Sequence, residues 1–325
     1  MENPPSERVA FQDLQPHGGE AFGRAVLGGL ALPHKALPAK FFYDQRGSAL
    51  FEQICQLPEY YPTRTEMGIL ARCLPEMIPL LGERCVLIEY GSGNSEKTRL
   101  LLQSVRPLAY LPVDISHEQL RDACASLHRD YPWLTIEALC ADYTGAFELP
   151  GWALDVELRR SIFFPGSTIG NFTPEEAVPF LERAARLVGR GGVMLVGVDL
   201  KKDARILNLA YDDPAGVTAA FNLNVLERIN RELEGDFDCR TFRHRAFYNE
   251  ALGRVEMHLV STRAQVVHVM GVSFRFEEGE SIHTENSYKY TATEFQALAD
   301  RAGFDSQAVW TDEARRFSVH CLVSR

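Results

Sequence analysis

Residues 86–93, with the sequence VLIEYGSG, determine the fold expected for this chain. A short, mainly apolar run that ends in two glycines is typical of a buried strand followed by a tight loop. Gly91 and Gly93 allow the backbone to turn sharply, and they let a ligand approach without meeting a Cβ atom. Loops also use glycine for ordinary structural reasons, so this pair alone is weak evidence for a ligand site.

Strands and helices alternate after this segment. Further buried strands are predicted at residues 111–114, 161–164 and 193–199. Two helix starts are marked by Ser116 with Gln119 and by Thr173 with Glu176, because both pairs have the spacing of a capping box. The alternation predicts a parallel sheet with helices on both faces.

Residues 201–290 interrupt this alternation. A helix is predicted over residues 216–234, and apolar and polar residues then alternate in segments such as 254–260 and 272–276. A period of two is typical of antiparallel strands with one face in water. The α/β pattern returns at the end of the chain, with a helix whose predicted capping box is Thr293 and Gln296, and then a strand hairpin.

The predicted fold class is therefore α/β, a nucleotide-binding sheet interrupted by an inserted α+β lobe. We expect the sheet domain at residues 64–200 and 291–325 and the substrate-binding lobe at residues 201–290. The aromatic-rich N-terminal segment, residues 1–63, is expected to contribute to the lobe. Its first twenty residues are polar and carry prolines, so they are predicted to lack regular structure.

The bulk composition excludes several classes of function. The formal net charge of −10, with acids and bases interspersed, offers no basic surface for nucleic acid or for an anionic membrane. No secretory signal or membrane-spanning run is present in the sequence. The seven cysteines contain no C-x-x-C pair and the nine histidines no ligand spacing, so we expect reduced thiols, no metal and a cytoplasmic location.

Two acids strengthen the case for a cofactor at the glycines. Asp114 ends the second strand about 20 residues after Gly91, where a carboxylate can accept hydrogen bonds from ribose hydroxyls. Asp142 follows the region where a third strand is expected. Each acid alone could equally be a turn residue. Because Glu96 replaces the third glycine of the dinucleotide pattern, the set favours a sulfonium nucleoside over NAD, with another adenosine cofactor still open.

Six sequence blocks resemble a known family, the histidine Nα-methyltransferases of ergothioneine biosynthesis. The blocks are FYD at residues 42–44, LPEYYPTR at 57–64, GSG at 91–93 with SEKT at 95–98, GSTIGN at 166–171, AYDDP at 210–214 and TENS at 284–287. The resemblance runs from about residue 38 to the C-terminus. It implies a class I, Rossmann-like methyltransferase sheet, with S-adenosyl-L-methionine as cofactor and S-adenosyl-L-homocysteine as its product.

The resemblance also implies a role for each matching residue. The cofactor is expected at Gly91, Ser92, Gly93, Lys97, Asp114 and Asp142. Tyr43 and Asn171 are expected as catalytic residues, with Tyr43 and the Gly166 backbone at the α-amine and Asn171 and Tyr211 at the carboxylate. The imidazole of L-histidine is expected at Tyr60, Met257, Glu285 and Ser287. One departure is Tyr90, which stands where the family has an aliphatic residue.

Several of these residues could also have ordinary structural roles. Tyr60 suits an apolar core, Tyr211 precedes a turn sequence, Asn171 leads into a helix cap, and glutamates such as Glu285 are usually solvated. Two other functions remain open: N-methylation of another amine, such as a tryptophan derivative, and cofactor binding without catalysis. A carboxylate at position 285 favours histidine, because it can accept a charge-assisted hydrogen bond from an imidazole N–H. A monomer acting on a small molecule is expected.

Overall fold

The computed structural model describes residues 9–14, 18–93 and 95–325 of the chain. Internal contacts divide the protein into two compact units. The first, here called the sheet unit, comprises Met1–Gln15, Pro62–Lys201 and Tyr290–Arg325. The second, here called the lobe, comprises Pro16–Tyr61 and Lys202–Lys289. In the described part of the chain, no helix has both the length and the apolar character needed to cross a membrane.

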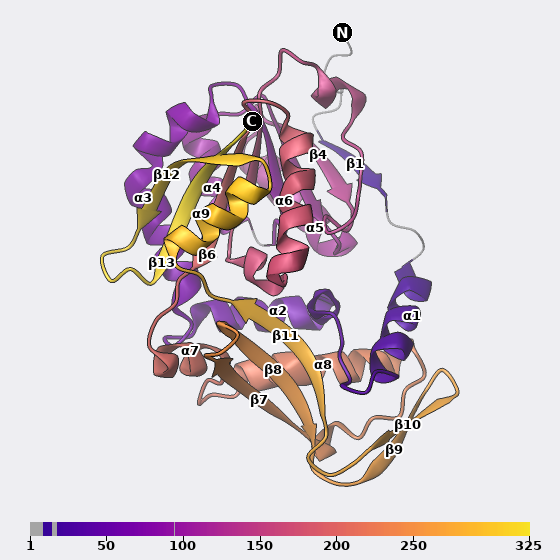
Figure 1. Cartoon of the computed structure of the whole chain (residues 1–325). Helices are drawn as coiled ribbons and strands as arrows, with labels where there is room; N and C mark the ends of the chain where they lie inside the picture. The colour runs from indigo at the N-terminus through magenta and orange to yellow at the C-terminus, as the bar shows by residue number, and fades with distance from the viewer. Residues whose placement is uncertain (1–8, 15–17, 94) are drawn as a thin grey trace. The chain divides into compact units, whose positions relative to one another are not determined.

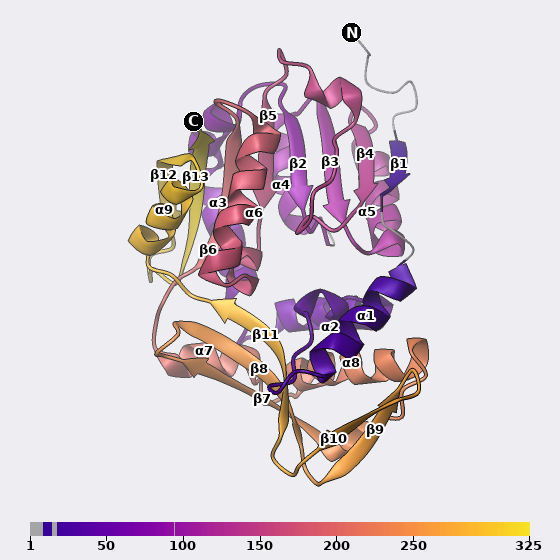
Figure 2. The same cartoon turned by 45° about the vertical axis from the view of Figure 1, so that its right-hand side comes forward.

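An eight-stranded sheet forms the centre of the sheet unit (Figure 2). Its strands are β1 (Val9–Asp13), β2 (Val86–Tyr90), β3 (Ala109–Asp114), β4 (Thr135–Cys140), β5 (Arg160–Phe164), β6 (Val193–Asp199), β12 (Phe304–Thr311) and β13 (Phe317–Ser324). They lie in the order β1-β4-β3-β2-β5-β6-β13-β12; the pairs from β1 to β6 are parallel, and β13 runs antiparallel to both its neighbours, β6 and β12. The order reverses between β2 and β5, which is where doubly wound folds bind nucleotides.

Helices cover both faces of this sheet (Figure 1). They are α3 (Tyr61–Leu81), α4 (Glu96–Val105), α5 (His117–Asp130), α6 (Pro174–Val188) and α9 (Ala292–Arg301), with short 3-10 turns η2 (Gly151–Leu154) and η3 (Thr168–Asn171). The helices α3, α4 and α5 pack their apolar side chains on one face, against residues such as Leu87 and Phe163. The other face carries α6 and α9. The predicted Rossmann-like α/β architecture is confirmed.

Three local predictions had different outcomes. Thr173 and Glu176 form the expected reciprocal capping box at the start of α6. The Ser116 side chain makes no capping bond; instead, the Asp114 carboxylate accepts the backbone N–H of Ser116 at 2.9 Å. The box predicted at Thr293 is wrong, because α9 begins two residues earlier and is capped by Thr291 and Glu294.

The expectation of an irregular N-terminus is wrong for Val9–Asp13. This segment is strand β1, which pairs in parallel with β4 from Val9 opposite Ile136 to Asp13 opposite Cys140. The pairing covers an edge of the sheet that would otherwise expose its backbone N–H and C=O groups. Residues 1–8 and 15–17 lie outside the described part of the chain.

The lobe combines helices with two small antiparallel sheets. Its helices are α1 (Gly18–Leu30), α2 (Gln45–Gln56), α7 (Ala204–Tyr211) and α8 (Val217–Glu232), with 3-10 turns η1 (Ala39–Phe42) and η4 (Cys239–Thr241). Its strands are β7 (Phe242–Asn249), β8 (Arg254–Ser261), β9 (Gln265–Val269), β10 (Val272–Phe276) and β11 (Ser281–Tyr288). One sheet has the order β11-β8-β7 and the other pairs β10 with β9.

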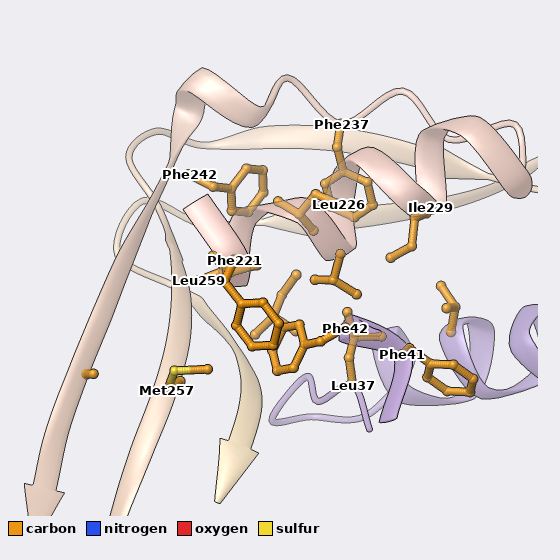
Figure 3. Close-up of a cluster of buried hydrophobic side chains, with 14 of the residues drawn as sticks. Leu37, Phe41, Phe42, Phe221, Leu226, Ile229, Phe237, Phe242, Met257 and Leu259 are labelled. Atoms are coloured by element: carbon orange, nitrogen blue, oxygen red, sulfur yellow. The ribbon is translucent and has the colours of Figure 1, made fainter. Parts of the chain in front are cut away.

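An aromatic core joins the N-terminal part of the lobe to its inserted part (Figure 3). The rings of Phe42 and Phe221 lie 4.7 Å apart, so the segment after α1 packs directly on α8. Met257 and Leu259 extend this core along β8. The aromatic N-terminal segment therefore builds the lobe together with residues that follow it by more than 140 positions in the sequence.

Candidate active site

The loops that follow β2, β3 and β4 are joined at the carboxyl end of the sheet. The Gly91 N–H donates to the Val113 carbonyl at 2.9 Å, and the Ala141 N–H donates to the Asp114 carbonyl at 3.0 Å. Gly91 and Gly93 have φ angles of +72° and +46°, a region that favours glycine. This edge lies at the reversal of strand order, so it is the expected place for a nucleotide.

Asp114 lies beside the glycine loop, as a ribose-binding acid should. Its carboxylate interacts with the backbone N–H groups of Ser116, Ser92 and Gly93. Burial raises the pKa of Asp114, and these backbone donors oppose that rise. Within the described residues, the buried hydroxyl oxygens of Ser92 and Ser95 have no hydrogen-bond partner. Unsatisfied polar atoms beside an acid and two glycines fit an adenosine cofactor with ribose hydroxyls.

An aromatic cluster accounts for the unexpected Tyr90. Its ring stacks on Tyr143 with 5.3 Å between centroids and 6° between planes, and it also meets Phe164 and Phe180 edge-on. A Cβ atom built on Gly91 would lie 3.7 Å from the Tyr143 hydroxyl, so this pair forms one wall of the glycine loop. Tyr90 therefore belongs to an aromatic cluster beside the glycine loop.

Asp142 is committed at one oxygen to its own turn. Its Oδ1 accepts the backbone N–H of Thr144 at 2.9 Å and the Thr144 hydroxyl at 2.5 Å. Its position at the end of β4, next to Ala141 and Tyr143, is nevertheless the one predicted for the acid that meets adenine. The turn therefore explains the hydrogen bonds of the Asp142 Oδ1. It does not explain why an acid stands at this end of β4.

A buried acid that the sequence analysis missed connects two predicted site residues. Glu66, on α3, is fully buried and forms an ion pair with Lys97 at 2.5 Å. The same carboxylate accepts the backbone N–H of Gly166 at 2.9 Å. Gly197, on β6, leaves the space it needs, because a Cβ there would lie 2.0 Å from the Glu66 Oε1. Glu66 thus holds the predicted cofactor lysine and the predicted amine-binding turn together.

Gly166 and Asn171 lie at the two ends of one tight turn. Gly166 has φ +81° and Ser167 φ +58°, and Asn171 is the last residue of η3. The Ser167 hydroxyl accepts the Asp199 N–H at 2.9 Å, which fixes the turn to β6. Because Glu66 already takes the Gly166 N–H, the carbonyl is the Gly166 group that suits an amine ligand.

A second set of predicted residues lies together in the lobe. Tyr211, from α7, and Ser287, from β11, are hydrogen-bonded through their hydroxyls at 2.8 Å. Lys289 donates to both, at 2.9 Å to Tyr211 and 2.8 Å to Ser287. Lys289 is only 1% exposed. A buried ammonium inside a predicted substrate site was not expected from the sequence.

Tyr60, Tyr43 and Glu285 extend this set. The Tyr60 ring lies 6.2 Å from that of Tyr211, and Tyr43 packs edge-on against Phe221 at 5.6 Å. Burial raises the pKa of Tyr60 well above its usual value, with a contribution from the charge of Glu285. Burial also raises the pKa of Glu285 to about 7, although the positive charge of Lys289 opposes this.

Met257 lies directly opposite Glu285 in the β8–β11 pairing. Opposite residues of an antiparallel pair point to the same face, so Met257 brings the apolar core up to the carboxylate. Figure 3 shows Met257 at the border of the aromatic cluster. The ordinary role of Met257 as a core residue therefore also holds.

The structure assigns the predicted residues to two sets. The sheet unit holds Gly91, Ser92, Gly93, Lys97, Asp114, Asp142, Gly166 and Asn171, and the lobe holds Tyr43, Tyr60, Tyr211, Met257, Glu285 and Ser287. Both missed residues carried a signal. Glu66 lies on the apolar stripe of its helix with Ile69, Leu70 and Cys73, and Lys289 continues the period of two set by Glu285 and Ser287.

A cluster with metal-ligand chemistry lies on the opposite face of β8. Donor atoms of Glu256, His258 and His283 come within 4.8 Å of one another. The Glu256 Oε1 already accepts a hydrogen bond from the Arg254 Nε at 2.8 Å and one from Asn249 at 3.0 Å. The two imidazole rings stack with 15° between planes, so their lone pairs lie in nearly parallel planes and do not converge. The cluster suits a charge network better than a metal.

Comparisons with known proteins agree over most of the chain. A family model described as histidine-specific methyltransferase, SAM-dependent, matches residues 22–324. The chain is 43% identical over 310 residues to the histidine N-alpha-methyltransferase of Mycolicibacterium smegmatis, covering 94% of this chain and 95% of that protein. Against the Mycobacterium tuberculosis protein of the same name, identity is 42% over 309 residues, covering 93% and 94%.

A longer fungal protein contains a related region. Ergothioneine biosynthesis protein 1 of Neurospora crassa is 31% identical over 299 residues, covering 89% of this chain and 33% of that protein. The sheet topology, the cofactor edge and the full-length similarity agree. The chain belongs to the family of histidine-specific, S-adenosylmethionine-dependent methyltransferases.

Proposed function

We propose that this chain transfers three methyl groups from S-adenosyl-L-methionine to the α-amino nitrogen of L-histidine, giving trimethylhistidine (hercynine), a step of ergothioneine biosynthesis. The observation that carries the choice of substrate is the partly buried carboxylate of Glu285, which lies two residues from Ser287 on β11 and interacts electrostatically with Tyr60 in the lobe. An imidazole N–H gives this carboxylate a charge-assisted partner, worth about 1.5–3 kcal/mol.

The cofactor residues have distinct tasks in this proposal. When bound, S-adenosyl-L-methionine supplies a methyl group that its sulfonium has already activated. Asp114 accepts hydrogen bonds from the ribose hydroxyls, and Gly91 and Gly93 let the loop approach the nucleoside. Asp142 meets the adenine amino group. Lys97, held by Glu66, fixes the loop that follows β2.

The substrate residues orient the amino acid. Asn171 and Tyr211 hold its carboxylate, and the Gly166 carbonyl with the Tyr43 hydroxyl accepts hydrogen bonds from its amine. Methyl transfer needs an uncharged amine in line with the methyl group, and such positioning supplies roughly 7–11 kcal/mol of the barrier. Hydroxyl and carbonyl partners let the amine rotate between successive transfers better than a carboxylate clamp would.

The test is to incubate the protein with S-adenosyl-L-methionine and each of the twenty amino acids and to follow the product masses. We expect histidine alone to gain three methyl groups. A monomethyl end product would contradict trimethylation, preferential methylation of tryptophan would support the alternative substrate, and no product with any amine would support cofactor binding without catalysis.

A variant pair tests the role of Glu285. We expect Glu285→Ala to lose histidine turnover while S-adenosyl-L-homocysteine affinity, measured by calorimetry, stays the same. Glu278→Ala removes an exposed carboxylate of the same lobe and is the matched control. Equal histidine kinetics in both variants would contradict the assignment. We also propose that the protein acts as a monomer in the cytoplasm. Its partners are proposed to be small molecules, because its net charge of −10 disfavours nucleic acid.

A further inference from the structure

Strand β11 carries one more residue than its partner strand directly before Glu285. His283 lies opposite His258, and Glu285 lies opposite Met257, so Thr284 has no opposite residue on β8. Such an extra residue is a β-bulge, which bends the strand and changes the direction of the side chains beside it. The bulge therefore adjoins the carboxylate that is proposed to recognise the substrate.

The bulge decides which face of the sheet Glu285 occupies. Met257 and Leu259 belong to the core of the lobe, and their opposite residues on β11 are Glu285 and Ile282. Opposite residues of an antiparallel pair point to the same face, whereas residues three positions apart in a regular strand point to opposite faces. Ile282 and Glu285 share a face because Thr284 is inserted between them. In a regular strand with Ile282 in the core, Glu285 would point away from it.

Two side chains hold the bulge. Thr284 is 1% exposed, and its hydroxyl donates to the Met257 carbonyl at 3.0 Å. The His283 Nε2–H donates to the Glu285 carbonyl at 3.0 Å, because a carbonyl can only accept. The ring of His283 is itself stacked on that of His258, with 4.7 Å between centroids and 15° between planes. One bond thus ties the bulge to β8, and the other spans it.

The backbone before the bulge is bound on its other side as well. The His283 N–H donates to the Lys35 carbonyl at 2.8 Å, and the His283 carbonyl accepts the Leu37 N–H at 2.8 Å. The strand is therefore held between β8 and the segment that follows α1. Because the residue before the bulge is fixed on both sides, a change at Thr284 must be taken up by the residues after it, of which Glu285 is the first.

We propose that Thr284 is a positioning and specificity residue, which aims the Glu285 carboxylate at the imidazole of the substrate through the bulge. This inference rests on the proposed function, which places the imidazole at Glu285. A hydrogen bond weakens steeply when its donor and acceptor are misaligned. Removing the Thr284 hydroxyl leaves the carboxylate present but misdirected, so histidine affinity should fall. The proposed cofactor residues belong to the sheet unit, so cofactor affinity should not change.

The experiment compares three variants with the unmodified chain. Thr284→Val removes the hydroxyl and keeps the shape, and Thr284→Ser keeps the hydroxyl. Thr262→Val is the matched control, since the Thr262 hydroxyl also donates to a backbone carbonyl at 3.0 Å, that of Thr241, but at an exposed position of the same lobe. Each protein is loaded with S-adenosyl-L-homocysteine, and the dissociation constant of L-histidine is measured by calorimetry.

We expect Thr284→Val to bind histidine about 10-fold more weakly, with Thr284→Ser and Thr262→Val close to the unmodified chain. S-adenosyl-L-homocysteine affinity should be the same in all four proteins. Unchanged histidine affinity in Thr284→Val would overturn the inference, and so would equal losses in Thr284→Val and Thr284→Ser.

A double-mutant cycle separates positioning from a general structural role. If Thr284 acts through Glu285, Thr284→Val should cause no further loss of histidine affinity in a Glu285→Ala background. A loss of the same size in both backgrounds would overturn the inference. If Thr284→Val does not fold, His283→Phe decides by the same cycle, because it keeps a ring against His258 and removes the Nε2 donor. Full histidine affinity in that variant would refute the role of the bulge.

Failure of the proposed function would look different. If Glu285→Ala alone binds histidine as tightly as the unmodified chain, the proposed recognition of the imidazole is wrong, and this inference falls with it. If Glu285→Ala weakens histidine binding and the bulge variants do not, the proposed function stands and only the role of Thr284 is refuted.

Discussion

Replacing Glu285 with glutamine should stabilise the lobe while weakening histidine recognition. Burial raises the pKa of the Glu285 carboxyl from 4.5 to about 7. Each tenfold change in a protonation equilibrium corresponds to about 1.4 kcal/mol, so ionising this carboxyl costs roughly 3 kcal/mol more in the folded lobe than in the unfolded chain. Glutamine has nearly the same shape and never carries this charge.

The sign of the effect follows from proton uptake. Between pH 4.5 and about 7, the folded protein holds a proton on Glu285 that the unfolded chain has lost. The free energy of unfolding contributed by this group therefore falls as pH rises through that window, and the penalty is complete above it. The stability advantage of Glu285→Gln should grow from near zero at pH 4.5 to roughly 3 kcal/mol at pH 8.

The assay must report on the lobe. All three tryptophans, Trp133, Trp152 and Trp310, belong to the sheet unit, so intrinsic fluorescence would miss the effect. Hydrogen exchange of peptides that cover β11, at pH 5 and pH 8, measures the opening free energy where the substitution lies. Glu278→Gln is the control, because its side chain is exposed. A stability difference between Glu285→Gln and the unmodified chain that is the same at both pH values would refute the reasoning.

Three further predictions concern the sheet unit. Glu66→Gln leaves Lys97 without its counter-charge, and we expect a loss of about 3 kcal/mol in the free energy of unfolding, measured with denaturant. Asp114→Ala should weaken S-adenosyl-L-homocysteine binding by about 10- to 100-fold in calorimetry, since charge-assisted hydrogen bonds are lost; unaltered binding would exclude the ribose role. Thr291→Ala should cost about 1 kcal/mol of stability through the cap of α9, whereas Thr293→Ala, at an exposed position, should cost much less, and the reverse order would contradict the observed cap.

The sheet could be predicted from the sequence because its strands are buried on both faces. Continuous apolar runs such as residues 193–199 and 161–164, bounded by turn residues, are typical of strands inside a parallel sheet. The strand Val9–Asp13 was missed, since it lies at an edge and mixes polar with apolar residues. The start of α9 was misplaced because Thr291 and Thr293 both have a suitable partner three residues later. Only the path of the chain decides which threonine caps the helix.

The site was harder to predict because charged side chains are usually solvated, whereas Glu66 and Lys289 are buried. Sequence patterns located the glycines and Asp114, whose places follow from the ends of the strands. They did not reveal that Lys97 would be paired with Glu66, which comes from a helix 31 positions away. The period of two along β11 places Lys289 on the face of Glu285 and Ser287, but it does not reveal that Tyr211, from α7, would hydrogen-bond to Ser287 and Lys289. Charged residues that fall on an apolar stripe are therefore the ones to suspect when a binding site is sought.

The contact between Gly197 and Glu66 should make these two positions, which lie far apart in the sequence, change together in evolution. Glycine weakens the interior of a strand, by roughly 0.5–1 kcal/mol relative to alanine. It is tolerated in β6 because the carboxylate of Glu66 occupies the volume of the missing methyl group. A larger side chain at position 197 would collide with Glu66, so it requires a smaller or displaced residue at position 66. A smaller residue at position 66, with Gly197 unchanged, would leave a cavity against β6. Substitutions at positions 66 and 197 should therefore occur together among related sequences. Mutant libraries that vary only one of the two positions should yield few active variants.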